Sequence, residues 1–314
     1  MLEGFFAAWP LDVLLSPWAL ALLGLLVGSF LNVVVHRLPL MLEQQWWGDV
    51  GAQLADAESY QRTFGAAMPD RLLLASDSLE KSIAGLSALN LARPASRCPA
   101  CGHRIRWFEN IPVLSWLALR GKCSACGTRI GLRYPLVEIA TALLFGALGW
   151  LVGPQPLAPL WCGVVATLLA LSLIDWDTTL LPDTLTLPLL WAGIGAAALG
   201  WLPGLTLIQS VAGAAAGYLS LWAVYWLFKL ATGKEGMGYG DFKLLAALGA
   251  WLGAAAILPI LLMASLLGAV VGLAMKASGA LRQGRFVPFG PFLAGGGVVT
   301  ILVGLPTMLG WIGW

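Results

Sequence analysis

The sequence predicts an all-α polytopic membrane protein with about eight transmembrane helices and a cytoplasmic zinc-ribbon-like domain inserted between the first and second helices. Hydrophobic residues make up 59% of the chain and charged residues only 11%, which leaves too few polar side chains to cover a soluble globule. Four of the five cysteines fall in one polar segment. We therefore expect a first transmembrane helix at 1–36, the cytoplasmic domain at 37–134, and a membrane core of about seven helices at 135–314.

The first predicted transmembrane helix covers residues 17–35. At about 1.5 Å per residue it is long enough to cross most of the hydrocarbon layer. Gly24 and Gly28 allow close packing against a neighbouring helix. Asn32 and His36 share one helical face, and interhelical packing or anchoring at the interface is the simpler explanation for both. The N-terminus lacks the basic region of a cleavable signal peptide, so we expect this helix to stay as an anchor.

The second half of the polar domain is organised by cysteine. Two CxxC motifs, Cys98 with Cys101 and Cys123 with Cys126, are separated by twenty-one residues, close to the spacing of a zinc ribbon. Four thiolates complete a tetrahedral shell with no open position, which predicts structural zinc. Two disulfides are the alternative. His103 is then not needed as a ligand, and we expect it at the surface.

Six apolar segments follow the polar domain and predict the remaining seven transmembrane helices. The segment at 244–275 is too long for one crossing, and Gly253 with Pro259 offers a place to fold it into two short helices. The fifth cysteine, Cys162, is interpreted as a small buried hydrophobe. The other apolar segments cover residues 136–152, 157–174, 185–202, 207–230 and 291–312.

The distribution of basic residues predicts the orientation of the chain. Twelve of the eighteen Lys and Arg residues lie in the polar domain, and the other six lie around 229–243 and 276–285. Eight spans place all of them on one face, which by the positive-inside rule is the cytoplasm. Both termini then face the periplasm. Within the polar domain, we expect residues 44–91 to be irregular or loosely helical.

The stretch Gly-Met-Gly-Tyr-Gly-Asp at 236–241 places an acid at the lip of a predicted membrane helix. Ionisable groups at such positions are functional candidates. Gly236, Gly238 and Gly240 remove side chains ahead of Asp241, which lets the backbone bend sharply and lets the backbone of another chain approach the carboxylate. A peptide-cleaving site requires this access. An interfacial turn with a solvated aspartate is the alternative, so the interpretation needs a second acid.

A second group of acids follows the apolar segment at 157–174. Asp175, Asp177 and Asp183 are three of only six carboxylates beyond the polar domain, and the predicted topology puts them on the same face as Asp241. Asp175 should lie deepest, so we expect it to form the pair, whereas Asp183 is expected in a cap or turn. Two facing carboxyls share one proton, so one can activate a water while the other polarises a carbonyl or protonates the leaving amine. Helix capping is the alternative role.

These features together resemble the bacterial type IV prepilin leader peptidase family, bifunctional membrane enzymes of the GxGD aspartic-protease class. The resemblance covers nearly the whole chain. Besides the two CxxC motifs and the Gly-rich acid motif, it is carried by the segments at 28–39, 133–138, 173–183, 233–243 and 288–291.

The resemblance implies that the catalytic pair falls on Asp175 and Asp241. It also implies the substrates, which are type IV prepilins and type II secretion pseudopilins cut after a glycine in the bacterial inner membrane. The new N-terminal residue is then expected to be methylated with S-adenosylmethionine. The residues that bind this methyl donor are not identified, and Glu109, Lys234 and Glu235 are candidates. No nucleic acid partner is expected.

Two other classes of protein are the alternatives. An ion-coupled membrane transporter also uses intramembrane acids, but it predicts acids near the membrane midplane, whereas these acids cluster at one face. A zinc-bearing scaffold for secretion leaves the Gly-rich acid motif unexplained. The sequence therefore favours an enzyme.

Overall fold

The computed structural model describes residues 11–279, 287–311 and 313, and their regular secondary structure is helical. The all-α prediction is confirmed for these residues, among which the only β-structure is two isolated bridges. The elements are α2 (Leu11–Leu14), α3 (Pro17–Ala55), α4 (Ala57–Phe64), α5 (Asp70–Ala84), η1 (Trp107–Asn110), α6 (Leu114–Ala118), α7 (Arg133–Val152), α8 (Leu157–Thr178), α9 (Asp183–Ala198), α10 (Leu207–Thr232), α11 (Tyr239–Leu252), η2 (Ala254–Ala256), α12 (Ile257–Ala277), α13 (Gly290–Val303) and α14 (Leu305–Trp311).

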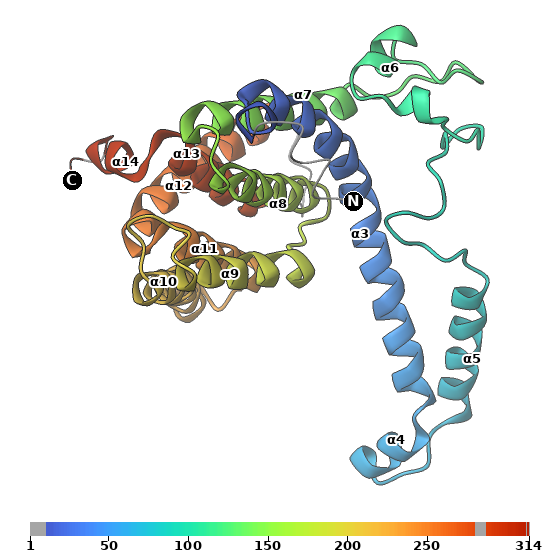
Figure 1. Ribbon diagram of the computed structural model, residues 1–314. Helices are drawn as coiled ribbons and strands as arrows, with labels where there is room; N and C mark the ends of the chain where they lie inside the picture. The colour runs from blue at the N-terminus through green and yellow to red at the C-terminus, as the bar shows by residue number, and fades with distance from the viewer. Residues whose placement is uncertain (1–10, 280–286, 312, 314) are drawn as a thin grey trace. The chain divides into compact units, whose positions relative to one another are not determined.

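The chain divides into two compact units. The inserted unit is Asn32–Gly131, and the membrane unit combines Met1–Leu31 with Leu132–Trp314. Figure 1 shows the helices of both units, and α3 contributes to each of them. The sequence-based boundaries after residues 36 and 134 remain predictions.

Five helical segments of the described chain are long and apolar enough to cross a membrane. They are α3, α7, α8, α10 and the segment Ala254–Ala277, and a sixth is formed if α13 and α14, bent by 112°, count as one broken span. The protein is therefore a multi-pass membrane protein. With 16 and 14 residues, α9 and α11 are shorter than a straight crossing requires, so the count of eight stays a prediction.

The first half of the polar region is more regularly helical than the sequence predicts. Helix α3 continues past Pro39, which lies inside it, and ends only at Ala55. Proline removes one backbone donor, but the Leu, Met, Glu and Gln residues that follow are good helix formers and carry the helix onward. Helices α4 and α5 occupy much of the remainder, so residues 44–91, predicted to be irregular or loosely helical, are helical over most of their length.

Hydrogen bonds attach the later part of the inserted unit to α3. Ser76 on α5 donates from Oγ to the carbonyl oxygen of Gly51 at 2.8 Å, and α5 runs beside α3 in Figure 1. Arg37 is buried, and its guanidinium donates to the carbonyl oxygens of Asn90 at 2.9 Å and Pro94 at 2.7 Å. Arg37 therefore anchors this loop to α3.

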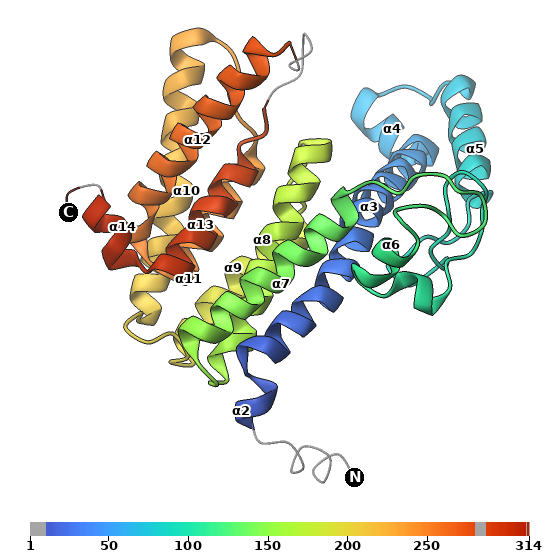
Figure 2. The same cartoon turned by 90° about the horizontal axis from the view of Figure 1, so that it is seen from above.

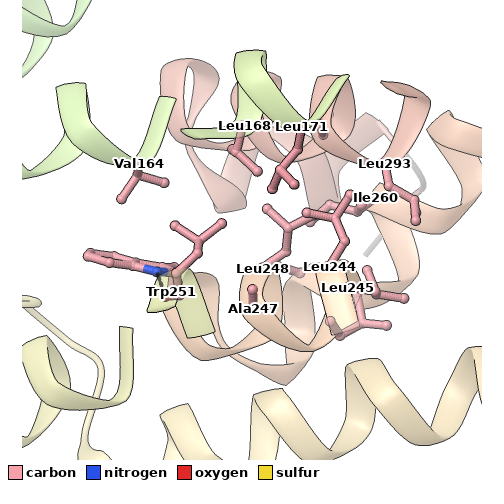
Figure 3. Close-up of a cluster of buried hydrophobic side chains, with 14 of the residues drawn as sticks. Val164, Leu168, Leu171, Leu244, Leu245, Ala247, Leu248, Trp251, Ile260 and Leu293 are labelled. Atoms are coloured by element: carbon pink, nitrogen blue, oxygen red, sulfur yellow. Dashed lines mark hydrogen bonds between the residues drawn. The ribbon is translucent and has the colours of Figure 1, made fainter. Parts of the chain in front are cut away.

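Helix α11 is the centre of the membrane unit. It packs against α9, α10, α12 and α13, and it is buried around nearly its whole circumference. Figure 3 shows side chains of α11 facing those of α8, α12 and α13, and Figure 2 shows the helices of the membrane unit from a second direction. The indole of Trp251 donates to the carbonyl oxygen of Leu189 on α9 at 2.8 Å, which satisfies its polar atom. This hydrogen bond holds the end of α11 to α9.

Glycines let α3 approach α7 closely. A Cβ atom added at Gly24 would lie 2.7 Å from the Cα of Ala142, and one added at Gly28 would lie 2.7 Å from the Cα of Glu138. Neither position has room for a side chain. The predicted close packing at Gly24 and Gly28 is therefore confirmed, and the partner is α7.

A second glycine contact joins α10 to α11. Gly213 faces Gly249 so closely that a Cβ on either would meet the backbone of the other, and Gly217 faces the backbone of Leu245 in the same way. Ser210 on the same side of α10 donates from Oγ to the carbonyl oxygen of Ala250 at 2.7 Å. This contact fixes α11 along its length.

The long apolar segment at 244–275 breaks where the sequence predicts. Helix α11 ends at Leu252, Gly253 has φ +80°, and η2 leads directly into α12. Glycine adopts this conformation without steric penalty. Pro259 lies in the first turn of α12, where its missing donor costs no helical hydrogen bond.

Candidate active site and metal centre

The last turn of α8 buries one acid and exposes another. Asp175 is 5% exposed and follows Leu171 and Ile174, which are fully buried against the core. Asp177 lies on the exposed side, where Arg133 at the start of α7 donates to both of its carboxylate oxygens, at 2.8 and 2.7 Å. The apolar face of α8 therefore carries Asp175 inward. Asp175 is the deeper of the two acids, as its place in the sequence predicts.

The first turn of α11 buries the other acid of the predicted pair. Gly238 is the N-cap residue, and Asp241 follows in the first helical turn with 8% of its surface exposed. Its neighbour Phe242 is fully buried and draws this turn into the core. The Oδ1 atom of Asp241 is buried and has no hydrogen-bond partner among the described residues. A buried polar atom of this kind needs a donor, and a substrate or water can supply one.

The two acids are brought together at one end of the membrane unit. The backbone N–H of Gly290, at the start of α13, donates to Oδ2 of Asp175 at 3.0 Å. Leu181 lies close to the surroundings of both acids. A Cβ atom added at Gly240, the residue before Asp241, would lie 2.8 Å from the Cβ of Leu181, and one added at Gly290 would lie 3.1 Å from the Cδ1 of Leu181. Leu181 therefore packs beside the backbone next to Asp241 and beside the residue that holds Asp175. The arrangement can hold a shared proton.

The three glycines before Asp241 act differently from the sequence prediction of a sharp bend. None of them has a positive φ. A Cβ at Gly236 would lie 2.8 Å from the ring of Phe228, and one at Gly240 would meet Leu181, whereas Gly238 is open. The glycines at 236 and 240 are explained by the lack of room for a side chain and not by their backbone conformation. Access of another chain at Gly238 stays a prediction.

A second cross-helix ion pair lies two residues beyond Asp241. Lys243 on α11 donates to both carboxylate oxygens of Asp183, each at 2.7 Å. Asp183 is the first residue of α9, where an acid also complements the helix dipole. The sequence predicts a cap or turn role for Asp183 and gives no indication of its ion pair with Lys243. Sequence patterns carry no distance between these two helices, so neither this pair nor Arg133 with Asp177 could be identified from them.

The four predicted metal ligands form one cluster. Their Sγ atoms all lie within 4.8 Å of one another, with 3.8 Å between Cys98 and Cys126 and 4.0 Å between Cys101 and Cys123. In a tetrahedral site with zinc–sulfur distances of about 2.3 Å, the sulfur atoms lie about 3.8 Å from one another. All four cysteines are free thiols, so the disulfide alternative is not what the structure shows. The donor set and its spacing fit a closed structural site for a metal such as zinc.

Each CxxC motif forms the same tight turn. Gly102 and Gly127 follow the second cysteine of each motif with φ of +70° and +71°, which glycine adopts readily. The residues flanking each turn form an isolated antiparallel bridge, Arg97 with Arg104 and Lys122 with Arg129. Backbone hydrogen bonds lower the pKa of the Cys98 thiol, and Thr128 lowers the pKa of Cys126 to about 6. Both effects favour the thiolate at these two positions, whereas hydrogen bonding to Cys126 raises the pKa of Cys101 to about 12.

A buried carboxylate ties the two turns together. Glu109 accepts hydrogen bonds from the backbone N–H of Arg106 at 2.8 Å and from the hydroxyl of Ser124 at 2.5 Å. The Arg106 amide, followed by Ser124, lowers the pKa of Glu109 to about 2. His103 lies 3.3 Å from the same carboxylate and is half-buried, so it belongs to this network and not to the four-sulfur cluster. Sequence spacing contains no indication of this network.

The candidate methyl-donor residues already have local partners. Glu109 belongs to the network just described, and Glu235 accepts a hydrogen bond from Lys229 at 2.9 Å, which lowers the pKa of Glu235. The backbone N–H of Lys234 donates to the hydroxyl of Thr232 at 3.3 Å. Glu109 lies in the inserted unit and the other two lie in the membrane unit. These contacts do not assign a cofactor site.

Comparison with known proteins gives the family. The family model of the bacterial peptidase A24 N-terminal domain matches residues 22–152, and the model of the type IV leader peptidase family matches residues 162–273. A prepilin leader peptidase/N-methyltransferase of Burkholderia pseudomallei (strain 1026b) is 50% identical over 305 residues, which cover 97% of this chain and 90% of the relative. The chain belongs to the type IV leader peptidase family.

Two further family members are also named prepilin leader peptidase/N-methyltransferase. The Pseudomonas putida protein is 50% identical over 284 residues, covering 90% of this chain and 88% of the relative. The Pseudomonas aeruginosa PAO1 protein is 48% identical over 302 residues, covering 96% and 93%. No solved structure matches the chain. Membership of the family favours the enzyme over the transporter and scaffold alternatives.

Proposed function

We propose that the chain is a membrane-embedded aspartic endopeptidase that removes the leader peptides of type IV prepilins and type II secretion pseudopilins after a glycine, and then methylates the new N-terminal residue. The observation that carries the peptidase activity is the buried pair of carboxyls, Asp175 and Asp241, at neighbouring helix ends. Relatives of about 50% identity over nearly the whole chain are named for both activities.

The environments of the two acids support different roles. Asp175 accepts an N–H from Gly290, and a hydrogen bond to a carboxylate favours its charged form. Asp241 has a buried oxygen without a donor among the described residues, which favours the protonated form. Asp175 therefore takes a proton from the attacking water, whose oxygen bonds to the scissile carbonyl carbon. Asp241 gives its proton to the carbonyl oxygen, which forms a gem-diol. Asp175 then passes the proton it took from water to the leaving amine as the C–N bond breaks, and a gem-diol hydroxyl returns a proton to Asp241.

The arrangement also supports a way for the substrate to reach the acids. A pilin leader precedes a hydrophobic helix, which would lie in the bilayer beside the apolar faces of the membrane unit. Gly238 offers open space in the loop before Asp241. A glycine at the scissile position gives an unhindered backbone that can approach it. The access loop is thus proposed as Gly236, Gly238 and Gly240, with Gly238 as its open point.

The four-cysteine cluster is proposed to hold zinc with a structural role. Cys98, Cys101, Cys123 and Cys126 would bind it, and a closed four-thiolate shell supplies a cross-link and no open coordination position. The methyl donor is proposed to be S-adenosylmethionine, and we assign no residues to it. The basic residues support an inner-membrane topology with the acids at the cytoplasmic face and both termini in the periplasm.

The test of the peptidase proposal is replacement of each acid by its isosteric amide. Asp175→Asn and Asp241→Asn should each lower cleavage of a purified prepilin by at least about 100-fold, because general acid–base catalysis by one group contributes on this scale. Asp177→Asn is the matched control, because it lies one half-turn away on the exposed side of α8. Cleavage at the wild-type rate by either Asn variant of the pair would refute the pairing.

The same assay separates cleavage from methylation. Labelled S-adenosylmethionine is added with either the prepilin or a synthetic pilin that already lacks its leader. Methyl transfer to the pre-cleaved pilin should survive both Asn substitutions, since these acids are proposed to act on the peptide bond. If the folded Asn variants fail to methylate the pre-cleaved pilin, the two acids take part in both reactions.

A further inference from the structure

We propose that Gly290 is a positioning residue for Asp175: its backbone N–H holds the carboxylate, and its missing side chain leaves the space that the carboxylate occupies. The inference rests on the proposed peptidase function of the acid pair and goes beyond it, because it concerns a residue remote in sequence on α13. Gly290 is buried and is the first residue of that helix. It acts on Asp175 both through a hydrogen bond and through the space it leaves.

The start of α13 leaves one backbone donor for a side chain. Helices begin with N–H groups that have no intrahelical acceptor. In α13, Pro291 has no N–H, and the N–H groups of Phe292 and Leu293 both reach the carbonyl oxygen of Phe289, at 3.1 and 3.2 Å. The N–H of Gly290 instead points at Oδ2 of Asp175, at 3.0 Å. The positive end of the helix dipole adds to the attraction for the carboxylate.

The space around Gly290 explains why the residue is glycine. Gly290 has no positive φ, so its backbone conformation is open to other residues. A Cβ atom at this position would lie 2.5 Å from Oδ2 of Asp175, 3.2 Å from its Cγ and 3.1 Å from Cδ1 of Leu181. Real Cβ contacts are not this short, so even alanine must displace the carboxylate or the helix end. The position is therefore fitted to Asp175 itself.

Only one acid of the pair receives this support. Asp241 gains no hydrogen bond from the described part of α13, and its Oδ1 has no partner among the described residues. Displacement of Asp175 should therefore change the separation of the two carboxyls and their alignment on the scissile bond. A misplacement of about 1 Å in a reacting group can cost about 100-fold in rate. Binding of the long pilin helix does not depend on this contact.

The activity test uses two alanine substitutions in the same helix. Gly290→Ala should lower kcat for prepilin cleavage by about 100-fold while KM changes by less than about 3-fold. Gly295→Ala is the matched control, because a Cβ at Gly295 meets nothing within 4 Å, and it should retain wild-type kcat and KM. Methylation of a pre-cleaved pilin should be unchanged in both variants. A Gly290→Ala enzyme with wild-type kcat would overturn the proposal.

A stability cycle tests the contact independently of activity. Gly290→Ala should lower the thermal midpoint of the purified full-length protein, and it should do so much less in an Asp175→Ala background, where the carboxylate is absent. The Leu181 contact is present in both backgrounds and cancels. Equal losses in the two backgrounds would overturn the proposal. If Gly290→Ala alone does not accumulate, restored accumulation of the double variant supports the contact and continued failure counts against it.

These two measurements separate the positioning role from the proposed function. If the wild-type protein fails to cleave any prepilin, the proposed function fails, and the stability cycle still decides whether Gly290 and Asp175 depend on each other. If the wild-type protein cleaves and Gly290→Ala cleaves equally well, the peptidase stands and the positioning role is wrong.

Discussion

The two units of the chain differ in how they bury side chains. In the membrane unit, one cluster of buried hydrophobic residues extends through α8, α9, α10, α11, α12 and α13. In the inserted unit, the buried hydrophobic side chains are Val34, Val35 and Leu38 on α3 and, from residue 40 to residue 131, Cys98 alone. Both units are built of helices and turns, so secondary structure does not explain the difference. From residue 40 onward the inserted unit therefore has no apolar core, and this part must be stabilised in another way.

That difference indicates which interactions each unit depends on. The membrane unit is held by close helix contacts through glycine, which do not rely on exclusion of water. The inserted unit has hydrogen bonds from Arg37, Ser76 and the Glu109 network, together with four clustered thiols. Small domains without a sufficient core need a cross-link or a metal. Perturbations should therefore affect the two units separately.

The largest expected effect is removal of the metal. Cys98→Ser or chelation of the purified protein should unfold residues 97–131, because structural zinc contributes on the order of 10 kcal/mol of folding free energy to small zinc domains. Hydrogen exchange should become fast in peptides from this segment and stay slow in α11. Zinc content, measured by atomic absorption, should fall together with the protection of residues 97–131 against hydrogen exchange.

Cys162→Ala is the control for this experiment. Cys162 is buried in the membrane unit and lies outside the four-sulfur cluster. The variant should keep its zinc and the protection of residues 97–131. The contrast between the units would be wrong if Cys98→Ser kept its wild-type zinc content. It would also be wrong if α11 lost as much protection against hydrogen exchange as residues 97–131.

An intermediate effect is expected at the glycine contact of the membrane unit. Gly213→Ala should lower the free energy of unfolding by about 1–3 kcal/mol, because its Cβ meets the backbone of Gly249 and the helices must separate. The measurement is thermal unfolding in detergent. Gly163→Ala, where a Cβ meets nothing within 4 Å, should be neutral or slightly stabilising. Equal midpoints for the two variants would show that close approach of α10 and α11 is not required.

Much of the site could be predicted because its signals are local in sequence. The four cysteines are recognisable from spacing, and the break at Gly253 follows from the length of an apolar segment. Asp175 is preferred over Asp177 from its place at the end of an apolar run, and the structure buries Asp175 and exposes Asp177. Whether Asp175 is catalytic remains a prediction.

The features that could not be predicted depend on distances between helices. The hydrogen bond from Gly290 to Asp175 joins residues 115 positions apart, and the pair of Lys243 with Asp183 joins α11 to α9. No periodicity or composition encodes such pairings. The continuation of α3 through Pro39 was missed for another reason, because a single proline indicates a helix end more strongly than the flanking residues indicate continuation.

The smallest expected effect is at the ion pair beyond Asp241. Asp183→Asn should lower the free energy of unfolding by less than about 1 kcal/mol, because the side chains of Lys243 and Asp183 are 30% and 54% exposed and the pair is screened by water and salt. The measurement is the thermal midpoint at low salt and at about 0.5 M salt, where the Debye length is only a few ångströms. Lys276→Gln, which removes a cation outside the ion pairs found in the described chain, is the control.

Exchanging the two charges sharpens this prediction. Lys243→Asp alone places two acids together and should cost more than Asp183→Asn, and adding Asp183→Lys should recover part of that loss. Recovery should be incomplete, because Asp183 is the first residue of α9 and a lysine there opposes the helix dipole. Full recovery would mean that the pair acts through its mutual attraction alone. No recovery would mean that the dipole, and not the pairing with Lys243, accounts for the acid at position 183.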